Sequence, residues 1–169
     1  AGRVSDPGLV LGPAIYEFGW KKDDYDKLAA GTLAGHILEC GAQCSGGNFT
    51  DWKNIPELDN VGYPIAHLSD DTTFQITKPV KTGGLINKYT IIEQILYEMG
   101  DPKNYISPDV VVDFTSFNLN EISDNVVEVS GVKGYPATDT YKVSINYFNG
   151  YKASGQLTIS GPDALEKAE

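Results

Sequence analysis

The segment 35–52 constrains the fold more than any other part of the chain. It contains a histidine, a glutamate, two cysteines, a glutamine and four glycines. The residues before it are typical of helices, and the residues after it become increasingly typical of strands. Glycine commonly ends a helix because it adopts the left-handed conformation without strain. The segment therefore predicts a transition from a helix to a glycine-rich loop, which is a suitable place for a site, although it matches no known catalytic signature.

Composition and charge narrow the class of protein. A length of 169 residues fits one domain, so we expect residues 1–169 to form a single domain. The net charge of −10, with no cluster of Lys or Arg, opposes binding to nucleic acid. No apolar run approaches the roughly 20 residues that span a membrane, so no membrane partner is expected. Two cysteines make no disulfide framework, which favours a reducing compartment and a cytoplasmic location.

Two helices are predicted in the first 40 residues. The first covers 9–18, with Asp6 as its N-cap, Pro7 at its first helical position, and Gly19 at its end. The second covers 24–38 and has an apolar stripe of Ala30, Leu33, Ala34, Ile37 and Leu38. Glycines at 31 and 35 weaken such a helix, so we expect another part of the chain to approach it closely there.

A third helix is predicted near residue 90. Thr90 and Glu93 have the spacing of a capping box, and Gly100 supplies a stop. Its expected apolar stripe consists of Ile92, Ile95, Leu96 and Met99. A short terminal helix is expected after Gly161-Pro162, and the two chain ends together suggest a piece of a larger protein.

Strands are predicted in the second half of the chain, where apolar residues alternate with polar ones. They cover 63–68, 73–77, 110–114, 126–132, 143–148 and 151–159, with a turn at 123–125 and a hairpin turn at Asn149-Gly150. Helices followed by antiparallel strands predict an α+β fold, with the N-terminal helices packed on a mainly antiparallel sheet. The alternative is that the chain is part of a larger α/β domain.

Three residues of segment 35–52 are candidates for catalysis: His36, Glu39 and Cys40. His36 and Cys40 are four apart, so on one helix they share a face, and the histidine could take the thiol proton to make a nucleophile. However, Cys40 lies at the helix C-terminus, where the helix dipole disfavours a thiolate. The competing interpretation is a buried thiol beside a capping histidine.

Metal binding is a weaker hypothesis. His36, Glu39, Cys40 and Cys44 have suitable ligand types, but they lack the paired spacing of zinc sites. Mg²⁺ held by carboxylates such as Asp6 or Asp51 leaves little trace in a sequence and stays open. No metal ligand is therefore assigned, and no cofactor is named.

The loop 78–84 has the ingredients of an anion-binding site. It contains lysines and glycines and precedes a helix N-terminus, although it lacks the order of a P-loop. A plain surface loop is the alternative. The glycine-rich loops 41–47 and 78–84, together with Asp6, supply the candidate ligand-binding residues. These are Asp6, Gln43, Gly46, Gly47, Lys78, Thr82, Gly83 and Gly84.

Several longer motifs resemble one family across nearly the whole chain and in the same order. They are residues 2–6, 11–13, 17–20, 35–43, 46–47, 62–66, 77–79, 82–84, 93–94, 96–98, 101–102, 108–111, 113–114 and 150–151. The stretch Gly-His-Ile-Leu-Glu-Cys-Gly-Ala-Gln at 35–43 is the most recognisable of them. Together they resemble the N-terminal domain of the acyclic terpene utilisation family, in its second half.

The resemblance implies a role in bacterial catabolism of terpenes such as citronellol, beside enzymes that act on acyl-CoA. Members of the family are larger, which implies that this chain is a portion of a larger family domain. The resemblance supplies no catalytic set to transfer. Cys44 departs from the family pattern, which weakens hypotheses that need both thiols.

Two functions are expected from these observations. The first is a catalytic domain acting on an acyl-CoA or related carboxylated small molecule, with both glycine-rich loops around the pocket. The second is a non-catalytic assembly or scaffold subunit beside such enzymes. A pocket that joins His36 or Glu39 to Asp6 or Lys78 would favour the first. The expected partners are a small-molecule ligand, the remainder of the family domain or a companion chain, and further copies in an oligomer.

Overall fold

The computed structural model describes residues 5–140, 147–159 and 161–168. Its helices are α1 (Gly8–Phe18), α2 (Tyr25–Leu38), α3 (Lys88–Leu96) and α4 (Ala164–Ala168). Its strands are β1 (Ile65–Leu68), β2 (Phe74–Thr77), β3 (Tyr105–Ile106), β4 (Val110–Asp113), β5 (Asn118–Ser123), β6 (Val126–Ser130) and β7 (Lys133–Pro136). Short 3₁₀ turns at Gly41–Gln43, Trp52–Asn54 and Leu58–Asn60 lie between α2 and β1.

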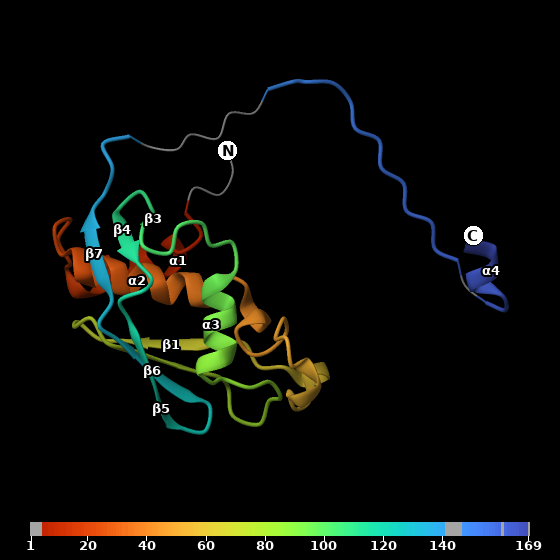
Figure 1. Ribbon diagram of the computed structural model, residues 1–169, viewed down its shortest axis with the longest axis horizontal. Coiled ribbons are helices and arrows are strands. Elements are labelled where there is room, and N and C mark those ends of the chain that lie inside the picture. The colour runs from red at the N-terminus through yellow and green to blue at the C-terminus, as the bar shows by residue number, and fades with distance from the viewer. Residues whose placement is uncertain (1–4, 141–146, 160, 169) are drawn as a thin grey trace.

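The strands form two sheets, with α2 lying between them (Figure 1). One sheet has the order β1-β2-β6-β5 and the other β3-β4-β7, and the pairs within both are antiparallel. Helix α2 contacts β4 and β7 of the smaller sheet and β1 of the larger one. The predicted α+β class is confirmed, but the strands divide into two sheets around a central helix instead of forming one sheet under the helices.

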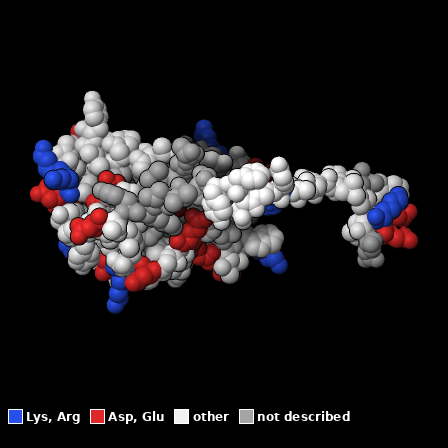
Figure 2. All heavy atoms as spheres, turned by 90° about the horizontal axis from the view of Figure 1, so that it is seen from above, with Lys and Arg blue, Asp and Glu red and all other residues white. Residues whose placement is uncertain are grey.

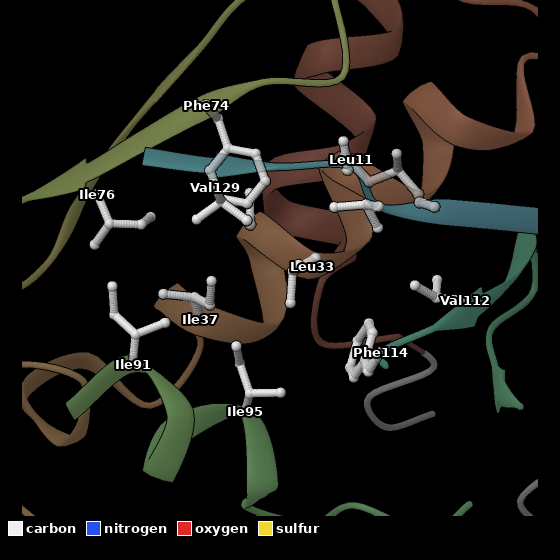
Figure 3. Packing of buried hydrophobic residues seen from close by; sticks show 14 of the residues in the cluster. Leu11, Leu33, Ile37, Phe74, Ile76, Ile91, Ile95, Val112, Phe114 and Val129 are labelled. Atoms are coloured by element: carbon white, nitrogen blue, oxygen red, sulfur yellow. The ribbon is translucent and has the colours of Figure 1, made fainter. Parts of the chain in front are cut away.

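Helix α2 is buried on nearly all sides. Every residue from Leu28 to Ile37 is buried, whereas Leu38 is only partly so. The predicted one-sided stripe was therefore too narrow. A helix that is apolar all round belongs in the interior of a fold. In Figure 3, Leu33 of α2 lies among side chains that reach it from β2, α3, β6 and the segment after β4.

The predicted close approach at the helix glycines is confirmed, and it comes from α1. A Cβ atom at Gly35 would lie 2.6 Å from the Cα and carbonyl oxygen of Pro7. A Cβ atom at Gly31 would lie 2.9 Å from Leu11 Cδ1. The two glycines thus let α1 cross α2 at a distance that side chains would prevent.

The two ends of α1 agree only in part with the ends predicted from the sequence. Gly19 ends the helix in the left-handed conformation, with φ of 64°, as expected. At the other end, Pro7 and not Asp6 occupies the N-cap position, and no side chain caps the helix. The prediction of Asp6 as N-cap was wrong, since the chain turns into the helix one residue later.

Helix α3 starts and ends earlier than predicted. Its capping box joins Asn87 and Thr90, so the proposed Thr90–Glu93 box was wrong. It ends at Leu96, and its buried residues are Thr90, Ile91, Gln94 and Ile95, so only Ile95 of the predicted stripe is buried in the helix. Leu96 is 61% exposed. Because the helix stops before Gly100, Glu98 lies outside it, with φ of 53°.

The strand predictions were correct for the first hairpin and for 110–114, but β3, β5 and β7 were missed. The strand predicted at 126–132 is β6, which pairs with β5 and β2. Residues 147–159 contain no strand, so this half of the hairpin predicted at Asn149-Gly150 was wrong, and 143–146 lie outside the described residues. Tyr151 is 96% exposed there, and a hairpin without a packed face is marginal in water. The segment extends away from the body to α4, the expected terminal helix (Figure 1).

The surface agrees with the acidic composition. On the face shown in Figure 2, the described Lys side chains are scattered among acidic ones. Within the described residues, no helix has the length and apolar character that crossing a membrane requires.

Candidate functional site

His36 is held in one orientation near the end of α2. The side chain is 1% exposed, and its Nε2 donates to the carbonyl oxygen of Ile95 at 3.0 Å. That carbonyl belongs to the last turn of α3, where it has no partner within the helix. The ring also packs against Tyr105 and Phe114, with ring centroids 5.4 and 5.5 Å away. In a neutral His36 the proton is on Nε2, so Nδ1 carries a lone pair.

Glu39 approaches the other nitrogen of the same ring. Its Oε1 lies 3.0 Å from His36 Nδ1, yet Nδ1 makes no hydrogen bond of acceptable geometry. The Glu39 side chain is 8% exposed. We regard the pair as a close electrostatic contact, because the short distance is not accompanied by the alignment that a hydrogen bond requires.

A cavity of about 250 Å³ opens beside this pair. It is bounded by the segment before α1, the end of α2, Glu98 and the segment around β3. Its lining residues are Ser5, Asp6, Pro7, His36, Glu39, Glu98, Tyr105, Ile106, Ser107 and Pro108. The predicted site residues His36, Glu39 and Asp6 thus come together, although they are separated by up to 33 positions in the chain (39 − 6).

Three carboxylates gather at this cavity. One oxygen each from Asp6, Glu39 and Glu98 lies within 4.8 Å of the others. The described lining includes neither lysine nor arginine. Carboxylate oxygens are the ligands that hard divalent cations prefer, so the cluster has the donor type for such a cation.

The carboxylates affect two neighbouring groups. Burial, with the negative charges of Glu39, Asp6 and Glu98, raises the pKa of Tyr105 to about 12. The Tyr105 hydroxyl therefore stays protonated at neutral pH and can donate a hydrogen bond. Burial and the same carboxylates also raise the pKa of Cys40, against the lowering effect of a hydrogen bond from Gln94.

Cys40 is not paired with His36 as the sequence suggested. Helix α2 ends at Leu38, so Cys40 does not lie four residues along the same helix. The ring nitrogens of His36 contact Ile95 and Glu39, while the Cys40 thiol meets Gln94. Both cysteines are free, and burial raises the pKa of Cys44 to about 12. The raised pKa values leave little thiolate at neutral pH.

The two glycine-rich loops contact each other and lie outside the lining of this cavity. The backbone N–H of Leu85 donates to Ser45 O at 2.9 Å. A Cβ atom at Gly47 would lie 2.8 Å from Ala42 O, and one at Gly46 would lie 2.8 Å from Ile55 Cδ1. Gly83 is confined still more tightly, by the backbone of Glu57. These glycines, with Gly84 at φ of 84°, allow the loops to pack closely.

Polar residues of the loops bond within the fold. Lys78 Nζ donates to Thr82 O at 2.6 Å, and the Thr82 hydroxyl donates to Pro79 O at 2.7 Å. Gln43 Nε2 donates to Gln94 Oε1 at 3.4 Å, and Gln94 Nε2 donates to His36 O at 3.0 Å. The loops therefore do not enclose His36 and Glu39 in one pocket, and the predicted ligand-binding role of their residues stays a prediction.

Sequence reasoning missed Glu98 and Tyr105. Glu98 falls within the helix that was predicted to stop at Gly100, and only the early end of α3 brings it to the cavity. Tyr105 belongs to the two-residue strand β3, which has too few residues to show a period.

The comparison with known proteins supports the family suggested by the sequence motifs. A family model described as acyclic terpene utilisation family protein AtuA matches residues 1–169, which is the whole chain. Searches of the curated proteins and of the solved structures found no match to this chain. The match covers the helices, both sheets and every residue of the cavity, so the chain belongs to the acyclic terpene utilisation family.

Proposed function

We propose that this chain is part of a catalytic domain that acts on an acyl-CoA or a related carboxylated small molecule in terpene catabolism. The observation that carries the proposal is the convergence of His36, Glu39 and Asp6 in one cavity. Active sites characteristically combine a concave pocket with a few converging polar groups. A cytoplasmic location is part of the proposal, because acyl-CoA metabolism takes place there.

The size and charge of the cavity determine which part of the ligand it takes. A volume of about 250 Å³ suits an acyl group and not the nucleotide of coenzyme A. The phosphates of coenzyme A are anionic, and three carboxylates inside the cavity would repel them. The acyl end would therefore enter the cavity, and the nucleotide would lie outside.

Three side chains have distinct roles in this proposal. Tyr105 donates a hydrogen bond to the acyl oxygen, since it lines the cavity and its hydroxyl is protonated at neutral pH. Glu39 is the proton-accepting group of the cavity. His36 is a positioning residue, because its contact with Ile95 O fixes the ring beside Glu39. Cys40 takes part only as a neutral thiol in this scheme.

Calorimetric titration with citronellyl-CoA, in the presence and absence of Mg²⁺, tests the proposal. We expect the wild-type chain to bind the ligand, and Tyr105→Phe to weaken binding about threefold to tenfold through loss of one hydrogen bond. Tyr63→Phe is the matched control, since Tyr63 is 64% exposed and outside the lining of the cavity. Its affinity should equal that of the wild type.

Two results would contradict a site in this cavity. One is the absence of binding by the wild-type chain to citronellyl-CoA and to free citronellate, with and without Mg²⁺. The other is equal affinity in the wild type and Tyr105→Phe.

Absence of binding would favour the second candidate, a scaffold subunit. The outer face of α1 supports that candidate, since Leu9 and Tyr16 are 89% and 88% exposed. Val10, Leu38 and Leu68 line a shallow apolar hollow beside it. This face would contact the remainder of the family domain, a companion chain or another copy in an oligomer.

A further inference from the structure

We propose that the hydrocarbon chain of the acyl ligand lies in an apolar hollow between α1 and α2, where Leu9, Val10 and Leu38 determine which chain lengths bind well. The inference rests on the proposed function and deepens it, because it adds a subsite and with it a substrate class, acyl groups with a long aliphatic chain. The hollow has a volume of about 470 Å³. The cavity beside His36 has only about 250 Å³, so a long chain needs this additional space.

The hollow and the cavity beside His36 adjoin each other. Three residues line both of them: Ser5, Asp6 and Glu39. The hollow is otherwise lined by Leu9, Val10, Gly35 and Leu38, and none of these has a polar side chain. Binding sites for small molecules commonly combine apolar walls with a few polar groups that fix the orientation of the ligand. A ligand with its acyl oxygen in the cavity can therefore extend past Glu39 into apolar surroundings.

The close crossing of α1 and α2 accounts for the shape of the hollow. The helices meet at Gly35, where a Cβ atom would lie 2.6 Å from the Pro7 backbone. Gly35 itself belongs to the lining, next to the side chains of Val10 and Leu38. Because glycine has no side chain, a ligand can approach the backbone closely there.

The apolar side chains of the hollow are in contact with water in the free chain. Leu9 is 89% exposed, and Val10 and Leu38 are partly exposed. Covering this surface with a hydrocarbon chain is favourable in proportion to the apolar area removed from water. Each methylene that becomes fully buried raises the affinity by up to about fourfold. The affinity should therefore increase with the length of the chain.

A small ligand fits this hollow better than a protein partner does. Seven residues line it, whereas a stable protein–protein interface takes about 20–30 residues on each side. A further apolar hollow shares Val10 and Leu38 with it and reaches Leu68 of β1. The cavity and the two hollows thus share lining residues in succession, which suits an elongated molecule with one polar end.

A series of thioesters tests the inference. We would titrate the full chain by calorimetry with butanoyl-, hexanoyl-, octanoyl- and decanoyl-CoA. We expect decanoyl-CoA to bind at least about tenfold more tightly than butanoyl-CoA, since its additional methylenes enter the hollow. The readout is the ratio of these two affinities, because effects of a substitution on folding or on the CoA end of the ligand cancel in it.

The variants Val10→Trp and Leu9→Asp test the walls of the hollow. The first fills the hollow, and the second places a charge at a wall, so butanoyl- and decanoyl-CoA should bind either variant almost equally. Leu9 is 89% exposed, so Leu9→Asp retains the fold if Val10→Trp does not, as checked by circular dichroism.

Gly12→Asp is the matched control for Leu9→Asp. Gly12 is an exposed residue of the same helix, lies outside the lining of the cavity and of both hollows, and has nothing within 4 Å of an added Cβ atom. The substitution adds the same charge. We expect the ratio of the two affinities to equal that of the wild type.

Three results would overturn the inference. They are equal binding of butanoyl- and decanoyl-CoA by the wild type, an unchanged ratio in Leu9→Asp, and an equal loss in Gly12→Asp. If the ratio is unchanged and sedimentation velocity shows self-association that Leu9→Asp abolishes, a second copy of the chain covers the hollow instead.

Failure of the inference can be distinguished from failure of the proposed function. Equal binding of all the thioesters, weakened by Tyr105→Phe, would support the function and contradict the hollow. Decan-1-ol contains neither a carboxylate nor coenzyme A. Its binding to the wild type, weakened in Leu9→Asp, would support the hollow as a hydrocarbon site even if no thioester binds and the proposed function is wrong.

Discussion

Replacement of Leu33 by alanine is expected to lower the free energy of unfolding by about 2–5 kcal/mol. Leu33 is fully buried in α2 and lies between side chains from both sides of that helix (Figure 3). Removing its three outer carbon atoms leaves a hole that the surrounding elements cannot all close, because they belong to two sheets and two other helices. Urea denaturation followed by circular dichroism measures the change.

Leu9→Ala is the control for this prediction. Leu9 lies on α1 and is 89% exposed, so the same change in chemistry removes little buried surface. We expect its free energy of unfolding to stay within about 0.5 kcal/mol of the wild type. Similar losses in the two variants would show that α2 is not the centre of the core.

Gly35→Ala is expected to lower the free energy of unfolding by about 1–3 kcal/mol. Alanine favours helices over glycine by about 1 kcal/mol, so propensity alone predicts the opposite sign. The added Cβ atom would lie 2.6 Å from the backbone of Pro7, which cannot move without displacing α1. The packing effect should therefore exceed the propensity effect. Thermal and urea denaturation of the purified variant measure the difference.

Gly8→Ala separates the two effects. Gly8 is the first residue of α1, and a Cβ atom there would meet only Ser5 Cβ at 4.0 Å. We expect this variant to be as stable as the wild type or slightly more stable. A Gly35→Ala variant that gains stability as well would contradict the close crossing of α1 and α2.

The sequence was informative where local chemistry decides the structure. The glycines of α2 predicted a close approach, Gly19 predicted the end of α1, and alternation predicted the first hairpin. The same local rules failed at α3, because Asn87 and Thr90 are both suitable N-cap residues, and the choice between them rests on which face packs against α2. The division of the strands into two sheets is likewise a matter of tertiary contacts.

The candidate site was predictable in part for a similar reason. His36, Glu39 and Asp6 stood out by residue type, and the structure places all three at one cavity. Glu98 and Tyr105 join them only through the path of the chain after α3, which no periodicity records. The loops 41–47 and 78–84 were correctly recognised as unusual, but close packing accounts for their glycines.

We propose that the ligand binds in the cavity beside His36. The two histidines of the chain allow this binding to be measured directly. His36 and His67 are the only histidines, and His67 is an exposed residue of β1 outside the lining of the cavity. Nuclear magnetic resonance of the ¹⁵N-histidine-labelled chain resolves the two rings during titration with citronellyl-CoA. We expect the ring signals of His36 to shift with saturation while those of His67 do not. Saturable binding that leaves the His36 signals unchanged would contradict it.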